Sequence, residues 1–144
     1  MAKTLPKIEK KAGTSFSPAQ AMAAIGLISM AADSHIDPSE VETLIQIVQR
    51  IDEFKEYSEK QMQDLLNTIT NISQTDGNGV LLGLAADALS TPGLKEAALK
   101  LAFLVVAADG NVVKEEEQFL TDLQNVLGIS NDRYDEILKQ LFGQ

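Results

Sequence analysis

Hydrophobic residues recur at helical spacing in seven segments of the chain, and capping or turn residues separate these segments. The segment at 92–108 contains Val105 and Val106, which are typical of strands, but the matching part of the first segment is rich in Ala and favours a helix. The sequence therefore predicts an all-α fold of about seven helices in a compact bundle. We expect these helices at about 18–32, 38 to 52–54, 59 to the break at 75–79, 79–89, 92–108, 114–127 and from 131 onwards.

Several helix starts carry explicit capping signals. Ser17-Pro18 and Thr91-Pro92 each place an N-cap residue before a proline at the first helical position. Residues 58–61 read Ser-Glu-Lys-Gln, which is a capping box. These signals predict the starts of the first, third and fifth helices.

Two stretches of the chain resemble each other. Each has an apolar helix that ends in Ala-Ala-Asp, at 31–33 and at 107–109, followed by a short connection and a polar helix start. Glu40 and Glu116 stand seven positions after the two aspartates. The repeat relates the first and second helices to the fifth and sixth. We therefore expect an approximate two-fold arrangement, with the first and fifth helices packed together at its centre.

The spacing within each repeat matches the second half of a calcium-binding EF-hand loop. Asp33 and Asp109 correspond to position 5 of that loop, and Glu40 and Glu116 to position 12. Positions 1 and 3 fall on residues without a carboxylate in both copies, so neither copy encloses a cation by itself. If the first and fifth helices pack side by side, the four acids gather at one end of the molecule. Such a set of oxygen ligands favours calcium, magnesium or manganese.

A network of helix caps and turns is the other interpretation of these acids, and the sequence leaves both open. Glu40 is explained as the third residue of a helix whose cap is Asp37. The corresponding cap position in the second copy is Val113, which has no side-chain oxygen, so capping does not explain Glu116. Asp37 and Glu115 are secondary candidates as metal ligands.

Charge is unevenly distributed along the 144 residues. The net charge of -9 argues against nucleic acid or an anionic membrane as a partner and favours cations or basic surfaces. Lysines give residues 1–16 a charge of +3, so residues 17–144 carry -12. We expect 1–16 to be a flexible basic leader and 17–144 to be a single helical domain.

Several function classes are disfavoured by what the sequence lacks. The chain has no cysteine, which excludes disulfides, thiolate catalysis and zinc-thiolate sites. Its apolar runs are well short of the ~20 residues that a membrane helix needs, and the N-terminus lacks the apolar core of a secretory signal. We therefore expect a cytoplasmic protein without membrane insertion. No histidine-rich set or nucleophile motif is present, so we expect no enzymatic activity.

The repeated motif lies in two matching helix-loop-helix contexts, with residues 31–33, 36–37 and 40 in the first and residues 107–110 and 115–116 in the second. In these segments the chain resembles the TerB-like tellurite resistance family. The order of the helices extends the resemblance over about residues 17–142.

The resemblance implies an all-α fold of seven helices and membership of a bacterial stress-response group associated with tellurite resistance. It also implies an acidic metal-binding surface, which by position comprises Asp33, Glu40, Asp109 and Glu116. The leading hypothesis is a non-enzymatic protein that binds a divalent cation through these acids and works with other stress-response proteins. The alternative is an interaction module whose acidic end binds a basic protein partner without metal.

Overall fold

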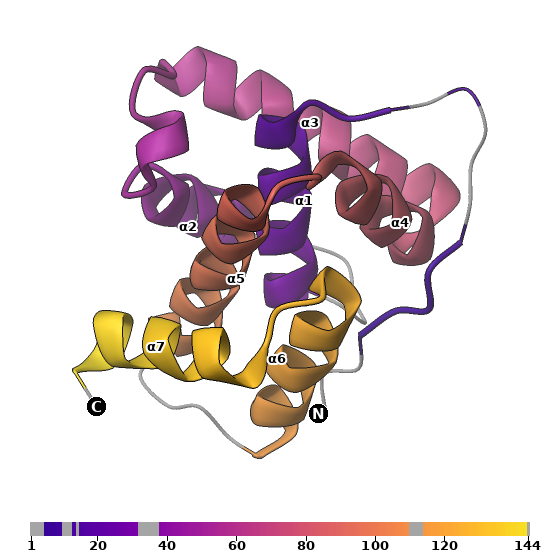
Figure 1. Ribbon diagram of the computed structural model, residues 1–144. Helices are drawn as coiled ribbons and strands as arrows, with labels where there is room; N and C mark the ends of the chain where they lie inside the picture. Colours follow the sequence, from indigo (N-terminus) through magenta and orange to yellow (C-terminus); the bar gives the residue numbers. More distant parts are fainter. Residues whose placement is uncertain (1–4, 10–12, 14, 32–37, 110–113, 144) are drawn as a thin grey trace.

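The computed structural model describes residues 5–9, 13, 15–31, 38–109 and 114–143 (Figure 1). In these residues the chain forms seven α-helices, two short 3-10 helices and no strand, which confirms the all-α class. The elements in chain order are α1 (Pro18–Ala31), α2 (Pro38–Val48), η1 (Asp52–Phe54), α3 (Glu59–Asp76), α4 (Asn78–Ala88), α5 (Pro92–Val106), η2 (Ala107–Asp109), α6 (Lys114–Leu127) and α7 (Asn131–Phe142).

Helix starts agree closely with the capping signals. The Ser58 side chain accepts a hydrogen bond from the Gln61 amide, and the Gln61 side chain accepts one from the Ser58 amide, which completes the capping box of α3. Thr91 caps α5 by accepting a bond from the Leu94 amide. These bonds join residues three positions apart, which is why the sequence alone predicts them.

The end of α2 differs from the prediction of 52–54. The α-helix ends at Val48, and the chain continues through tighter turns, with the Ile51 amide bonded to the Val48 carbonyl at 2.9 Å. Ile51 is then extended, with φ -92° and ψ 130°, before η1 begins. This break places Phe54 in the core, where it is 1% exposed. Burial of this aromatic ring favours the break over continuation of the helix.

The core is centred on α1, which packs most extensively against α5 and then against α4 (Figure 1). This confirms the expected packing of the first and fifth helices, while the approximate two-fold relation stays a prediction. Residues 21–29 of α1 are all buried. A Cβ atom at Gly26 would lie 2.9 Å from Leu44 Cδ1 and 3.2 Å from Leu101 Cδ2. The absent side chain at Gly26 therefore lets α2 and α5 approach α1 closely.

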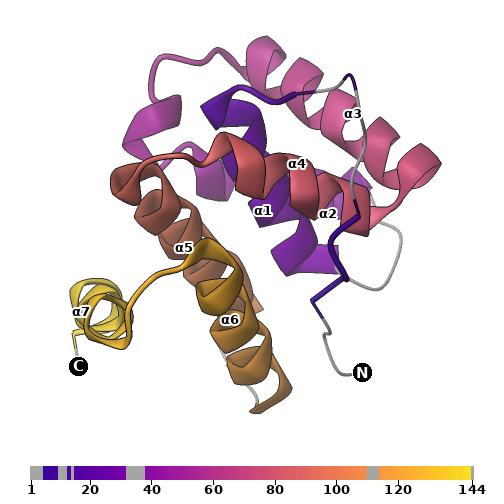
Figure 2. The same cartoon turned by 45° about the vertical axis from the view of Figure 1, so that its right-hand side comes forward.

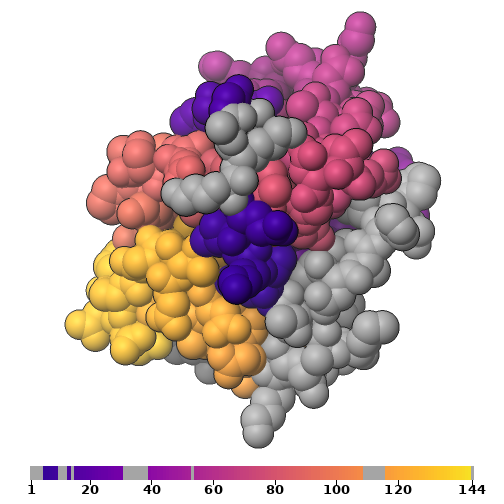
Figure 3. Space-filling model, turned by 90° about the vertical axis from the view of Figure 1, so that its right-hand side faces the viewer, coloured from indigo at the N-terminus to yellow at the C-terminus, as the bar shows by residue number. Residues whose placement is uncertain are grey.

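The α4 helix is buried on all sides from Gly79 to Ala85. Two of its sides are covered by α1 and α3, and a third by leader residues 5–9, which lie beside it (Figure 2). The Glu9 amide donates a 3.1 Å hydrogen bond to the Gly79 carbonyl. Figure 3 shows this indigo segment lying across the surface of the molecule. Main-chain contacts thus hold the described part of the leader, and the flexibility of residues 1–16 as a whole stays a prediction.

No helix in the described part of the chain combines the length and the apolar composition that a membrane span requires.

Candidate functional site

The structure describes two of the predicted ligand side chains. Asp33 and Asp37 lie outside the described residues, and so do the side chains of Asp109 and Glu115. The side chains of Glu40 and Glu116 are described, and they are the two predicted ligands that can be placed in the fold.

Glu116 is the third residue of α6, where the amides that open a helix and the helix dipole favour a carboxylate. Its exposed fraction is 8%, and it is the one charged side chain among the buried residues of the described chain. A buried carboxylate is stable only when other groups compensate for its lost hydration. Glu116 does interact with other groups. The Glu116 side chain is therefore packed within the folded protein at the start of α6.

Glu40 occupies the same position in α2, since this helix begins at Pro38 and Glu40 is its third residue. Its side chain is half-buried. Both α2 and α6 contact α5, and α1 and α5 run in the same direction, down the page in Figure 1. The C-terminal ends of α1 and α5 therefore lie toward the same side of the molecule.

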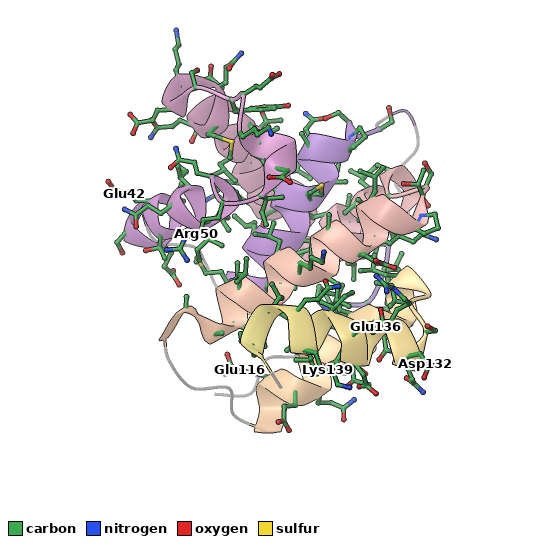
Figure 4. The ribbon with its side chains drawn as sticks, turned by 60° about the vertical axis from the view of Figure 1, so that its left-hand side comes forward. Glu42, Arg50, Glu116, Asp132, Glu136 and Lys139 are labelled. Carbon is green, nitrogen blue, oxygen red and sulfur yellow. The ribbon has the colours of Figure 1, made fainter. Side chains whose placement is uncertain are left out.

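The described residues by themselves do not form a metal centre. No group of three or more His, Asp or Glu side chains with metal-binding geometry occurs among them. Figure 4 shows Glu116 near the start of α6 and other charged side chains elsewhere, namely Glu42 on α2, Arg50 in the turn after α2, and Asp132, Glu136 and Lys139 on α7. The cluster of Asp33, Glu40, Asp109 and Glu116 stays a prediction, because two of its side chains lie outside the described set.

A second candidate site, which the sequence did not predict, is a pocket between α5, α6 and α7. Its volume is about 540 Å³, within the range typical of ligand sites. It is lined by Phe103, Glu117, Leu120, Thr121, Tyr134, Leu138 and Phe142. The helical pattern assigns Leu120, Tyr134 and Leu138 to buried faces, but it carries no sign that Glu117 and Thr121 face the same space.

Electrostatics distinguish this pocket from an ordinary gap between helices. Burial raises the pKa of the Tyr134 phenol, a hydrogen bond with Thr121 opposes this shift, and the nearby carboxylates of Glu117 and Asp135 add to it. The Tyr134 phenol is thus neutral at physiological pH, and the carboxylates of Glu117 and Asp135 make the electrostatic potential around it negative.

Comparison with known families supports the motif-based resemblance. The family model described as tellurite resistance protein TerB matches residues 19–139. The chain belongs to the TerB family. The comparison with curated proteins and that with solved structures gave no match.

The TerB match runs from the first turn of α1 into the last turn of α7. It therefore includes both helix pairs of the repeat, the two described glutamates and every residue that lines the pocket between α5, α6 and α7 except Phe142. Leader residues 5–9, which cover α4, lie outside the matched range.

Proposed function

We propose that this TerB-family protein binds a divalent cation at its acidic end and acts in tellurite resistance or a related stress response without catalysing a reaction. The ligands are Asp33, Glu40, Asp109 and Glu116, with Asp37 and Glu115 as secondary candidates. The observation that carries the proposal is the burial of Glu116 at the start of α6. Helix capping does not require this carboxylate, because the preceding cap position is Val113.

The packing of the helices supports a shared site. Because α1 and α5 lie together and run in the same direction, the C-terminal ends of both helices lie on one side of the pair. Glu40 and Glu116 then open the next helices at the same position, the third residue of each. This arrangement favours a single cation site to which both copies of the repeat contribute ligands over two separate calcium-binding loops.

The charge of such a cluster requires a counter-ion. Two carboxylates about 5 Å apart repel by roughly 3 kcal/mol at an effective dielectric constant of 20. A divalent cation removes this repulsion and takes carboxylate oxygens as ligands. With oxygen ligands alone, calcium, magnesium and manganese fit better than zinc or copper.

A basic protein partner is the second candidate for the same acidic end. The net charge of -9 favours this interpretation, because a strongly acidic domain attracts basic surfaces over long range. In this case the acids would pair with lysine or arginine side chains of another stress-response protein, and no metal would be needed.

Thermal melting with and without metal tests the leading proposal. We expect calcium, magnesium or manganese to raise the melting temperature of the EDTA-treated protein, and the rise to grow with metal concentration by mass action. Glu116→Gln and Glu40→Gln should each reduce this rise. Their controls are Glu117→Gln and Glu42→Gln, which remove the same charge from exposed positions on the same helices and should retain it.

Two outcomes would contradict cation binding. One is a melting temperature that no divalent cation changes. The other is a metal-dependent rise that persists when Asp109→Ala and Glu116→Ala are combined. Binding of a lysine-rich peptide in EDTA, weakened by the same double substitution, would support the basic-partner alternative in its place.

A further inference from the structure

Aromatic side chains gather in the pocket between α5, α6 and α7. The chain has five phenylalanines, two tyrosines and no tryptophan, and three of these rings lie together here. The Phe103 and Tyr134 ring centroids are 5.2 Å apart with planes at 65°, and those of Phe103 and Phe142 are 6.2 Å apart with planes at 86°. Phe103 thus packs edge to face against both other rings, and all three rings line the pocket.

One ring that lines the pocket is partly exposed to solvent. Phe142 has an exposed fraction of 38%, and it is one of two large hydrophobic side chains exposed in the described chain. Phe103, which packs edge to face against Phe142, is 2% exposed and belongs to the core. The pocket thus combines a buried aromatic ring with a partly exposed one.

In the described part of the chain, the one charged side chain that lines the pocket is the Glu117 carboxylate, which favours a positively charged ligand. Glu117 and Thr121 are one helical turn apart on α6, on the same face, and their side chains are exposed. No lysine or arginine is among the described residues that line the pocket. Arg133 on α7 is paired with Glu96 and Glu136 and does not neutralise Glu117.

We propose that this pocket is a binding site for a small organic ammonium ion with an apolar body. The ammonium group would lie against the faces of Tyr134 and Phe142 with Glu117 as its counter-ion, and the apolar body would contact Leu120 and Leu138. Aromatic faces attract cations through their quadrupole, and aromatic cages bind quaternary ammonium groups by this effect. The pocket volume of about 540 Å³ lies within the range of small-molecule sites. This size favours a small organic ion as the ligand over a lysine side chain of a protein partner.

Titration followed by NMR tests the site, with benzyltrimethylammonium as the probe and the full chain in EDTA. We expect amide shifts that saturate and that centre on Thr121, Tyr134 and Leu138. Neutral benzyl alcohol and anionic benzenesulfonate should bind about two- to fivefold more weakly, since an exposed cation–π contact contributes roughly 0.5–1 kcal/mol. Glu117→Gln and Phe142→Leu should each weaken binding of the probe by a similar factor.

A matched variant tests whether the loss of any surface carboxylate has the same effect. Asp64→Asn removes an exposed carboxylate on α3 and should leave the affinity for benzyltrimethylammonium unchanged. Equal binding of benzyl alcohol, or unchanged affinity in Glu117→Gln and Phe142→Leu, would overturn the proposal. An absence of saturable amide shifts with benzyltrimethylammonium would also overturn it. The same holds if a trimethyllysine peptide binds in the pocket and the small ion does not.

Discussion

Arg133 of α7 forms a bidentate ion pair with Glu96 of α5, in which Nε lies 2.9 Å from Oε2 and Nη2 lies 2.6 Å from Oε1. Glu136, one turn further along α7, also pairs with the same guanidinium. Bidentate geometry fixes orientation as well as distance. The pair therefore ties α7 to α5 next to the aromatic pocket that these two helices share with α6.

The pH dependence of stability follows from this pair. The hydrogen bonds from Arg133 hold the pKa of Glu96 below its ordinary value, although partial burial opposes the shift. A lowered pKa in the folded state contributes stability above the unfolded pKa of about 4.3, and this stability is lost as the pH falls through the folded pKa. Glu96→Gln should thus lower the melting temperature at pH 7 by about 1–2 °C, as expected for a partly exposed pair.

Melting curves from pH 7 to pH 3 check this expectation. The difference between Glu96→Gln and the parent should shrink as the pH falls below about 5. Glu56→Gln, which removes an exposed carboxylate after η1, serves as the control and should change the melting temperature little at pH 7. A difference that stays constant down to pH 3 would show that the ionised Glu96 is not the stabilising form.

The glycines of α4 test the contact with the leader. A Cβ atom at Gly79 would lie 2.2 Å from the Lys7 carbonyl oxygen, whereas one at Gly93 meets no atom within 4 Å. Each glycine is the second residue of its helix, so Gly93→Ala is a matched control for Gly79→Ala. We expect Gly79→Ala to destabilise the protein by about 1–3 kcal/mol or to displace the leader. Gly93→Ala should be neutral or stabilise by up to about 1 kcal/mol.

Urea unfolding and limited trypsin digestion distinguish the two glycines. In Gly79→Ala, displacement of residues 5–9 should speed cleavage after Lys7, while Gly93→Ala should be cleaved at the rate of the parent. Equal stability and equal cleavage in the two variants would mean that the leader does not pack on α4 in solution.

The capping box of α3 provides a third test. Ser58→Ala removes the oxygen that accepts the Gln61 amide and should cost about 1 kcal/mol. Thr68→Ala is the comparison, because the Thr68 hydroxyl bonds to the Asp64 carbonyl in the exposed middle of the same helix. Its removal should change the free energy of unfolding by less than about 0.5 kcal/mol. Urea unfolding that gives equal losses for both variants would argue against the cap as a stabilising element.

Prediction from the sequence succeeded where the interacting residues are close in the chain. Ser58 with Gln61 and Thr91 with Leu94 form caps across three positions, so residue types at fixed spacing suffice to locate the helix starts. The end of α2 was misplaced because the break before η1 depends on the burial of Phe54 among residues distant in sequence. No local pattern reports that contact.

Of the two candidate sites, the sequence indicated residues of the acidic site but not the pocket. The repeat indicated Glu40 and Glu116, and the structure places each as the third residue of a helix. Their convergence with Asp33 and Asp109 stays a prediction. The pocket around Tyr134 was missed, since its lining residues come from three helices and two of them, Glu117 and Thr121, carry no hydrophobic signal.

By itself the sequence determined the helical class, the helix starts, the central pairing of α1 with α5 and the resemblance to TerB proteins. Periodicity and caps are local properties of the chain, and a repeated motif is recognised by comparing two stretches of sequence. Tertiary structure alone decided that residues 5–9 cover Gly79, that Arg133 reaches Glu96 and that three aromatic rings enclose a pocket. These features join residues far apart in the chain, and their geometry depends on how all the helices fill one core.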